Sequence, residues 1–314
     1  MQKIKVYILI EHLGWNAKNH ADGLVRHAPP TWDITVCRWH AKEQDWHFDD
    51  ADVIINLGSH LHGKLYKECC ARAPNALLLS RYNTCYPRYE DKFNLLHKCS
   101  DAVLVESRKC FQLARPGHPR VYLAPSGVDG SVFRITAPPS RRPNRVLWCA
   151  GIIGQSEERA KVKRYEMALE IAARLKEHGL EMEVLAVDPN GETLKTRAEM
   201  IDWYNSGRIF VCTSIMEGVP NTILEAAACG CSIVSTPVGI VPEFIKHGLN
   251  GYVVQPTVDA FVEAIQQANK EYLQHVGDIK REVAEKDWNK LTGHYVQLVD
   301  ELLCLRDGDE GDIS

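Results

Sequence analysis

The 314-residue sequence lacks several patterns that define specialised classes of protein. No apolar run is long enough to span a membrane, and the one at 1–10 is too short for a signal peptide and has no cleavage site. No Gly-x-Gly-x-x-Gly follows a predicted strand, which argues against a dinucleotide-dependent oxidoreductase. No run of Lys and Arg with interleaved aromatic residues indicates nucleic-acid binding. We therefore expect a cytoplasmic globular protein with at most peripheral contact with the cytoplasmic face of a membrane.

Eleven cysteines are present, but they lack the arrangement of a disulfide framework or a zinc site. Their number is odd, and no Cys-x-x-Cys occurs. Cys229 and Cys231 flank a glycine at a predicted helix–strand junction, where small apolar side chains pack. We interpret the cysteines as reduced residues of the core.

Apolar segments with strand character alternate with helical segments along the whole chain. In its first part, strands are predicted at 4–10, 33–37, 52–57, 76–80 and 102–105, and helices at 19–27, 61–73, 89–99 and 109–114. In its second part, strands are predicted at 145–150, 182–187, 209–212 and 232–235, and helices at 163–178, 221–229 and 258–269. This alternation is typical of an α/β protein whose parallel sheets are covered on both faces.

Composition divides the chain into two domains. The Pro-rich segment 137–144 reads as a linker, which places an N-terminal domain at 1–136 and a C-terminal domain at 145–286. A last amphipathic helix is predicted at 287–305. The acidic tail at 306–314 lacks the spacing of a metal-binding loop, so we expect no metal there.

One stretch of the second domain places two carboxylates around the start of a helix. It reads Cys212-Thr-Ser-Ile-Met-Glu217-Gly-Val-Pro-Asn221-Thr-Ile-Leu-Glu225-Ala-Ala-Ala-Cys-Gly230. Glu217 lies in the loop before the helix and Glu225 one turn inside it, while the free N–H groups between them favour a phosphate. This order suits the ribose, diphosphate and hexose of a nucleotide sugar. On spacing alone, a turn residue and a solvated helix residue are the commoner explanation.

The surrounding residues resemble the donor-site signature of glycosyltransferase family 4. The signature reads Glu217-Gly-x-Pro-Asn-x-x-x-Glu225-Ala-x-x-x-Gly, then Ser-x-Val-x-x-Pro-Val-Gly-x-x-x-Glu243 and Gly248-x-Asn-Gly251. Members of this family are retaining, nucleotide-sugar-dependent enzymes of the GT-B fold. The resemblance implies two Rossmann-like domains that face a central cleft, with a C-terminal helix that crosses back to the first domain.

The resemblance also implies roles for particular residues. Glu225 would bind the ribose hydroxyls, and Glu217 would bind hydroxyls of the hexose. Lys163 matches the lysine that stabilises the leaving diphosphate, so Lys163 and Glu217 are the predicted catalytic residues. The donor would also lie against Gly218, Val219, Pro220, Asn221, Thr222 and the loop that contains Gly14, although Gly14 is equally compatible with a simple turn.

The sequence departs from the family at the phosphate. Ile152 stands where an arginine is usual, so Arg159 or Arg164 would have to supply that charge. Lys161, Lys163 and Arg164 are predicted at the start of the helix at 163–178. Cations there oppose the helix macrodipole by roughly 0.3–1 kcal/mol each, which a bound diphosphate would explain.

A second departure lies in the first domain, where the family has a histidine after the strand at 76–80. Here Tyr82 or Asn83 occupies that place, and Asn83 could bind a sugar hydroxyl but could not act as a base. His60 and His62, in the loop after the third strand, are possible substitutes as acceptor or sugar contacts. They could bind a metal only with a third ligand, which the sequence does not show.

These observations predict a retaining hexosyltransferase. It would move a hexose or N-acetylhexosamine from a nucleoside-diphosphate sugar to an acceptor hydroxyl, and the Gly218–Asn221 loop favours a UDP-sugar and polysaccharide biosynthesis. We expect no metal and no cofactor, with the nucleotide sugar as co-substrate and a carbohydrate or lipid-linked sugar as acceptor. The two departures leave two alternatives, which are a nucleotide-sugar-binding protein without turnover and a GT-B nucleotide-sugar epimerase.

Overall fold

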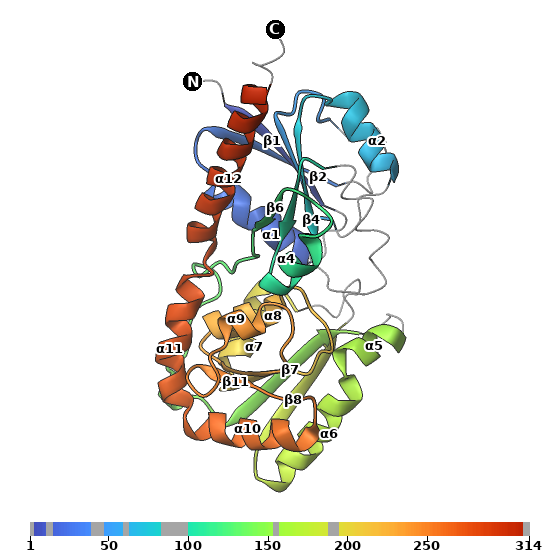
Figure 1. Ribbon diagram of the computed structural model, residues 1–314. Helices are drawn as coiled ribbons and strands as arrows, with labels where there is room; N and C mark the ends of the chain where they lie inside the picture. Colours follow the sequence, from blue (N-terminus) through green and yellow to red (C-terminus); the bar gives the residue numbers. More distant parts are fainter. Residues whose placement is uncertain are drawn as a thin grey trace. The chain divides into compact units, whose positions relative to one another are not determined.

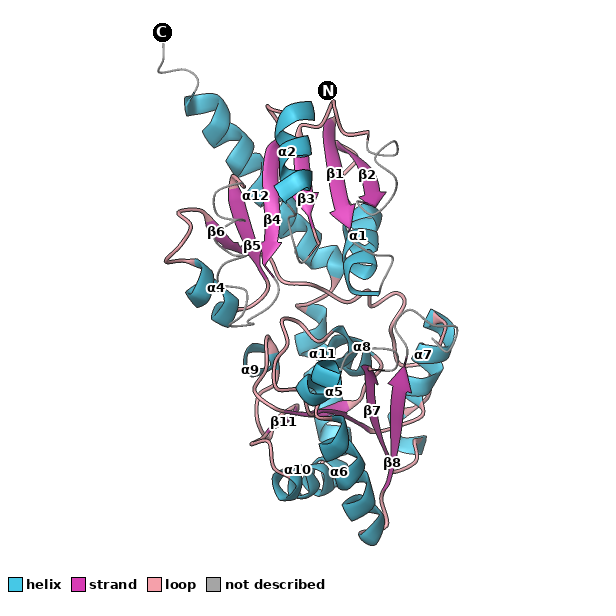
Figure 2. Ribbon diagram, turned by 90° about the vertical axis from the view of Figure 1, so that its right-hand side faces the viewer, coloured by secondary structure: helices cyan, strands magenta, loops and turns pink. Residues whose placement is uncertain are grey.

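The computed structural model describes residues 3–10, 15–38, 47–58, 63–82, 100–152, 157–187 and 195–309 (Figures 1 and 2). The chain forms two compact units. Unit 1 contains residues 1–127 together with 288–314, and unit 2 contains residues 128–287. The segment 137–144 thus falls inside unit 2 in this division, and the domain limits given above stay a prediction.

Unit 1 is built around a six-stranded parallel sheet with the order β2-β1-β3-β4-β5-β6. Its strands are β1 Ile4–Ile10, β2 Trp32–Arg38, β3 Val53–Asn56, β4 Leu77–Tyr82, β5 Ala102–Val105 and β6 Val121–Leu123. Its helices are α1 Trp15–His27, α2 Gly63–Arg72, α4 Arg108–Ala114 and α12 Trp288–Asp309. The predicted strands are confirmed, because short apolar runs buried on both faces are typical of parallel sheets. The predicted helix at 89–99 lies outside the described residues.

The C-terminal helix α12 completes the core of unit 1 and packs against α1. α12 and α2 lie on opposite faces of the sheet (Figure 2). Trp288 fits against Gly23, where a Cβ atom would lie 2.4 Å from the indole Cδ2. The Tyr295 hydroxyl donates to the Ala124 carbonyl at 2.8 Å. The helix reaches Asp309 rather than 305, because no proline interrupts it and the Arg306 guanidinium binds the Asn75 carbonyl.

Unit 2 is built around a five-stranded parallel sheet with the order β11-β10-β9-β7-β8. Its strands are β7 Arg145–Gly151, β8 Glu181–Val187, β9 Ile209–Cys212, β10 Ser232–Ser235 and β11 Gly251–Val253. Its helices are η3 Pro139–Arg141, α5 Glu157–Lys163, α6 Tyr165–Glu177, α7 Arg197–Asn205, α8 Asn221–Ala228, α9 Val241–Phe244, α10 Val258–Lys270 and α11 Tyr272–Ala284. Each unit is Rossmann-like, as the resemblance implied. In the described part of the chain, no helix combines the length and apolarity of a membrane span.

Candidate functional site

The residues of the signature meet at the carboxyl ends of β9 and β10 in unit 2. Thr236, which follows β10, donates from its hydroxyl to the Ser214 carbonyl at 2.6 Å, and Ser214 lies just beyond the end of β9. The Ile240 amide donates to the Gly218 carbonyl at 3.1 Å. These bonds join the two loops at the edge of the sheet where ligands of open parallel sheets bind.

Gly239 explains why the second loop can lie so close to the first. Its φ is +49°, and a Cβ atom there would lie 1.7 Å from the Gly218 carbonyl oxygen and 2.9 Å from that of Glu217. Only glycine combines this left-handed backbone with such a close approach. The backbone around Glu217 is therefore held by direct contact with Gly239.

Lys163 and Glu217, the two predicted catalytic residues, form an ion pair. The Lys163 ammonium binds Glu217 Oε1, which also accepts from the Ser214 hydroxyl at 2.6 Å. The two side chains are 21% and 15% exposed, so a ligand can still reach them. Burial lowers the pKa of Lys163, but the Glu217 carboxylate more than offsets this, and the net shift is upward. Lys163 therefore carries its charge at neutral pH.

The helix that was predicted at 163–178 is two helices, which corrects the argument about its first turn. α5 ends at Lys163 and α6 begins at Tyr165. Lys161 and Lys163 consequently lie in the last turn of α5, where the macrodipole favours cations instead of opposing them. Their charge needs no bound diphosphate to explain it.

Arg164 makes the break between the two helices. Its φ and ψ are 48° and 52°, and among the described residues it is the one non-glycine with positive φ. One guanidinium nitrogen donates to the Thr213 and Ser214 carbonyls at 3.1 and 3.3 Å. Arg164 therefore fastens the α5–α6 junction to the loop after β9. Its contact with the donor stays a prediction.

Two further bonds complete this junction. The Thr213 hydroxyl donates to the Lys163 carbonyl at 2.7 Å, and the Ile215 amide donates to the Val162 carbonyl at 2.7 Å. The end of α5 is thus held against the loop that carries Glu217. Arg159, the other proposed substitute for the family's arginine, is exposed and donates from Nε to the Gly151 carbonyl at 2.8 Å, beside Ile152.

Glu225 is buried instead of solvated, with 3% of its surface exposed. It lies on α8 between helix positions that contact the core, and its Oε2 accepts from the Tyr204 hydroxyl at 2.9 Å. Burial raises the pKa of Glu225 to about 7, although the Tyr204 hydrogen bond and the Arg197 charge work in the opposite direction. A buried carboxylate requires hydrogen-bond donors, and the Tyr204 hydroxyl is one of them.

The N-terminus of α8 lies between the two glutamates, as predicted. Pro220 is its N-cap and makes no capping bond from its side chain. The predicted donor contacts here are Gly218, Val219 and Pro220, which are buried, and Asn221 and Thr222, which are half-buried. At the other end, Gly230 adopts a φ of +85° just after the C-cap, in agreement with the predicted helix end.

The residues predicted in unit 1 are placed only in part. Tyr82 is the last residue of β4 and is 8% exposed, so it lies within the strand and does not follow it. Gly14, His60, His62 and Asn83 lie outside the described residues.

Arg81, next to Tyr82, has a partner that sequence reasoning missed. Its guanidinium pairs with Glu106, and both side chains are 1% exposed. Ser126 donates to the same carboxylate oxygen and lies 3.0 Å from His20 Nδ1. The sequence did contain a signal for this pair, namely an arginine near the end of β4 and a glutamate just after β5.

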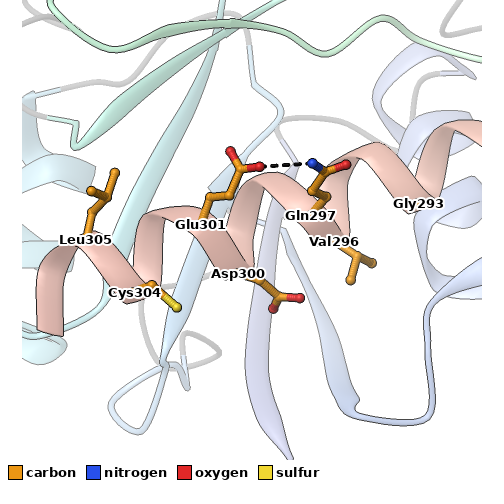
Figure 3. Close-up of a pocket in the computed structure, with 7 residues that line it drawn as sticks. All are labelled: Gly293, Val296, Gln297, Asp300, Glu301, Cys304 and Leu305. Carbon is orange, nitrogen blue, oxygen red and sulfur yellow. Dashed lines mark hydrogen bonds between the residues drawn. The ribbon is translucent and has the colours of Figure 1, made fainter. Parts of the chain in front are cut away.

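A surface hollow elsewhere in unit 1 contains none of the predicted donor residues. It runs along α12, where the Gln297 side-chain amide donates to Glu301 at 2.9 Å (Figure 3). Its lining consists of Gly293, Val296, Gln297, Asp300, Glu301, Cys304 and Leu305. Among the described residues, no group of three His, Cys, Asp or Glu could hold a metal ion.

Comparison with known proteins supports the signature. Residues 145–271 match the family model described as glycosyl transferases group 1. WcaL of Escherichia coli K12, which is named for glycosyl transfer in colanic acid biosynthesis, is 24% identical over 64% of this chain and 56% of its own. One subunit of the human phosphatidylinositol N-acetylglucosaminyltransferase is 39% identical over 20% of this chain and 13% of its own. The chain therefore spans little more than half the length of the first of these curated relatives.

A solved structure supports the fold. Anabaena HepE in complex with UDP and glucose aligns with a TM-score of 0.71 over 95% of this chain and 99% of its own, at 11% identity. At this identity the likeness concerns the fold, which is GT-B as predicted. The family model, the signature around Glu217 and Glu225, and this fold agree with one another. Over residues 145–271 the chain is therefore similar to the glycosyl transferases group 1 family, and the signature in that region resembles that of the retaining enzymes of glycosyltransferase family 4.

Proposed function

We propose that this protein transfers a sugar from a nucleoside-diphosphate sugar to an acceptor hydroxyl with retention of configuration. The observation that carries the proposal is the contact between Lys163 and Glu217, which lie 54 residues apart in sequence and meet beside the N-terminus of α8. Together with the buried Glu225, they arrange a cation and two carboxylates around one helix start.

Each of these groups suits one part of the donor. Glu225 would accept hydrogen bonds from the ribose hydroxyls. The N–H groups at the start of α8 and the Lys163 ammonium would bind the diphosphate. A diphosphate that takes up Lys163 would release Glu217 from its ion pair, so that its carboxylate could accept from hydroxyls of the hexose.

The same groups would stabilise the departure of the diphosphate. Negative charge grows on the phosphate as the glycosidic bond breaks, and Lys163 is already charged and held in place by its backbone contacts. Preorganised charges of this kind stabilise a transition state without reorganising during the reaction. We propose front-face attack, in which the leaving phosphate accepts the proton of the acceptor hydroxyl.

We further propose a UDP-hexose or UDP-N-acetylhexosamine as donor, and a carbohydrate or lipid-linked sugar as acceptor. The Pro-Asn form of the loop at Gly218–Asn221 supports this choice, and HepE, a protein of the same fold, was solved with UDP-glucose. WcaL is named for the synthesis of a polysaccharide, colanic acid. In this proposal the N-terminal domain at 1–136 serves the acceptor, and the C-terminal domain at 145–286 holds the donor.

The test is a panel of UDP-, GDP- and ADP-sugars, with thermal unfolding and nucleotide release as readouts. We expect a UDP-sugar to raise the melting temperature most, because a ligand that binds only the folded state stabilises it. Released UDP and a glycosylated acceptor should then appear together. Binding without release on any acceptor would favour a protein without turnover, and a changed sugar without an acceptor would favour an epimerase.

A further inference from the structure

The Tyr204 side chain is buried next to the carboxylate of Glu225. It lies on α7, and none of its surface is exposed. Its ring meets Phe210 and Phe133 edge to face, with centroids 5.8 and 6.3 Å away, and Trp203 at 5.3 Å. Three aromatic contacts leave the ring little freedom to turn, so its hydroxyl is held at one point.

The hydroxyl is held against the carboxylate of Glu225, which we assign to binding of the ribose. The Tyr204 hydroxyl donates to Glu225 Oε2 at 2.9 Å. Within the described part of the chain, the other titratable or charged groups that act on this carboxylate include Arg197 on α7, Cys149 on β7 and Cys229 after α8. Burial raises the pKa of both thiols, which stay neutral at pH 7, and an arginine stays charged. Between pH 6 and pH 8, Glu225 is therefore the member of this group whose charge changes.

We propose that Tyr204 is a positioning residue for nucleotide binding, whose hydroxyl keeps the Glu225 carboxylate oriented and ionised for the ribose hydroxyls. The inference rests on the proposed function. A carboxylate that is fixed by one donor offers its remaining acceptor positions in a defined direction. A protonated carboxyl group loses part of that acceptor capacity.

Two opposing influences on the pKa of Glu225 determine how the loss of the Tyr204 hydroxyl should change nucleotide binding. Burial raises its pKa, and the Tyr204 hydrogen bond lowers it. Without the hydroxyl, the pKa should rise further, so that more of the protein holds Glu225 protonated at pH 7. Nucleotide affinity at pH 7 should then fall, and more of it should return at higher pH.

The experiment measures UDP binding by calorimetry from pH 5.5 to 8.5 for the wild type, Tyr204→Phe, Tyr272→Phe and Glu225→Gln. Tyr272 is a matched control, because it is equally buried and donates to the Gly230 carbonyl instead of to Glu225. We expect Tyr204→Phe to weaken binding about tenfold at pH 7 and to move the midpoint of the pH profile upward by about one unit. Tyr272→Phe should leave the midpoint in place.

The Glu225→Gln variant isolates the pH dependence that belongs to this carboxylate. The terminal phosphate of UDP itself titrates near pH 6, so its contribution must be read from this variant and subtracted. When Tyr204→Phe is added to the Glu225→Gln variant, no further shift of the midpoint should follow. Equal midpoints for the wild type and Tyr204→Phe would overturn the proposal.

A ligand-free measurement separates this inference from the proposed function. The folded state binds a proton at Glu225 between its ordinary pKa of 4.5 and about 7, so this group's contribution to stability is complete below pH 4.5 and is lost as the pH rises through 7. Tyr204→Phe should extend that loss to higher pH in chemical unfolding. Absence of UDP binding by the wild type would contradict the proposed donor, whereas an unfolding profile unchanged by Tyr204→Phe would overturn the role of Tyr204.

Discussion

Two ion pairs, one in each unit, use similar groups in opposite ways. Arg81 and Glu106 in unit 1 are 1% exposed, whereas Lys163 and Glu217 in unit 2 are 21% and 15% exposed. The first pair is enclosed in the core, where the Ser126 hydroxyl hydrogen-bonds to both of its members and lies next to His20. Backbone hydrogen bonds hold the two segments that contain Lys163 and Glu217, and the side chains of this second pair stay partly accessible. Accessibility, more than the presence of a charge pair, therefore distinguishes the pair that we propose as part of the donor site from the pair in the core.

The largest expected effect comes from breaking the buried pair. Arg81→Leu should lower the free energy of unfolding by about 3–5 kcal/mol, because it leaves the buried Glu106 side chain without its ion-pair partner. Urea unfolding followed by fluorescence measures this loss. Replacing both residues, as in Arg81→Leu with Glu106→Leu, should cost less than the single change; a larger loss for the double variant would contradict a structural role for the pair.

The accessible pair should behave in the opposite way. Under the proposed function, Lys163→Ala removes a preorganised charge at the leaving group and should reduce kcat about 100- to 1000-fold. It should lower the free energy of unfolding less than Arg81→Leu does, because this pair is less buried. Lys161→Ala is the matched control, because Lys161 lies in the same helical turn and is 75% exposed. Steady-state kinetics with a UDP-sugar compare the two variants. Equal activities would exclude Lys163 from the reaction.

The smallest expected effect concerns the close contact of Gly239 with the Glu217 loop, which holds one member of the accessible pair. Gly239→Ala and Gly179→Ala both place a side chain on a left-handed backbone, at a cost of about 1–2 kcal/mol. A Cβ atom at Gly179 meets nothing within 4 Å, whereas one at Gly239 would collide with the Gly218 carbonyl. Both variants should lose stability, but only Gly239→Ala should also weaken UDP binding, by several fold in calorimetry. Unimpaired binding by Gly239→Ala would show that this contact does not hold the Glu217 loop.

The sequence predicted the strands well because their signal is local. A strand buried on both faces, such as β9 Ile209–Cys212, is a short apolar run between polar loops. The two glutamates and Lys163 were singled out only through the family signature, since their spacing alone favoured an ordinary turn. The structure brings Lys163 and Glu217 together, and their roles stay a prediction. α7 was not predicted, although its sequence contains a local signal. Thr196 and Glu199 form a capping box at its start.

Other features depend on contacts that no local pattern contains. The break at Arg164 interrupts a run with continuous helical character, and it is stabilised by carbonyls 49 and 50 residues away. Tyr204 and Glu225 lie 21 residues apart on different helices, and Arg81 and Glu106 lie 25 residues apart on neighbouring strand ends. Each pair becomes visible only when the topology of its sheet is known.

The position of α12 in the core of unit 1 has a consequence for the order of folding during synthesis. Unit 2 is one continuous segment, 128–287, whereas the core of unit 1 also requires Leu298, Val299 and Leu302. At 5–20 residues per second, a ribosome needs roughly 10–35 s to extend the chain from residue 127 to residue 302. We expect unit 2, although second in sequence, to complete its core first, because the core of unit 1 cannot be completed before α12 has been translated.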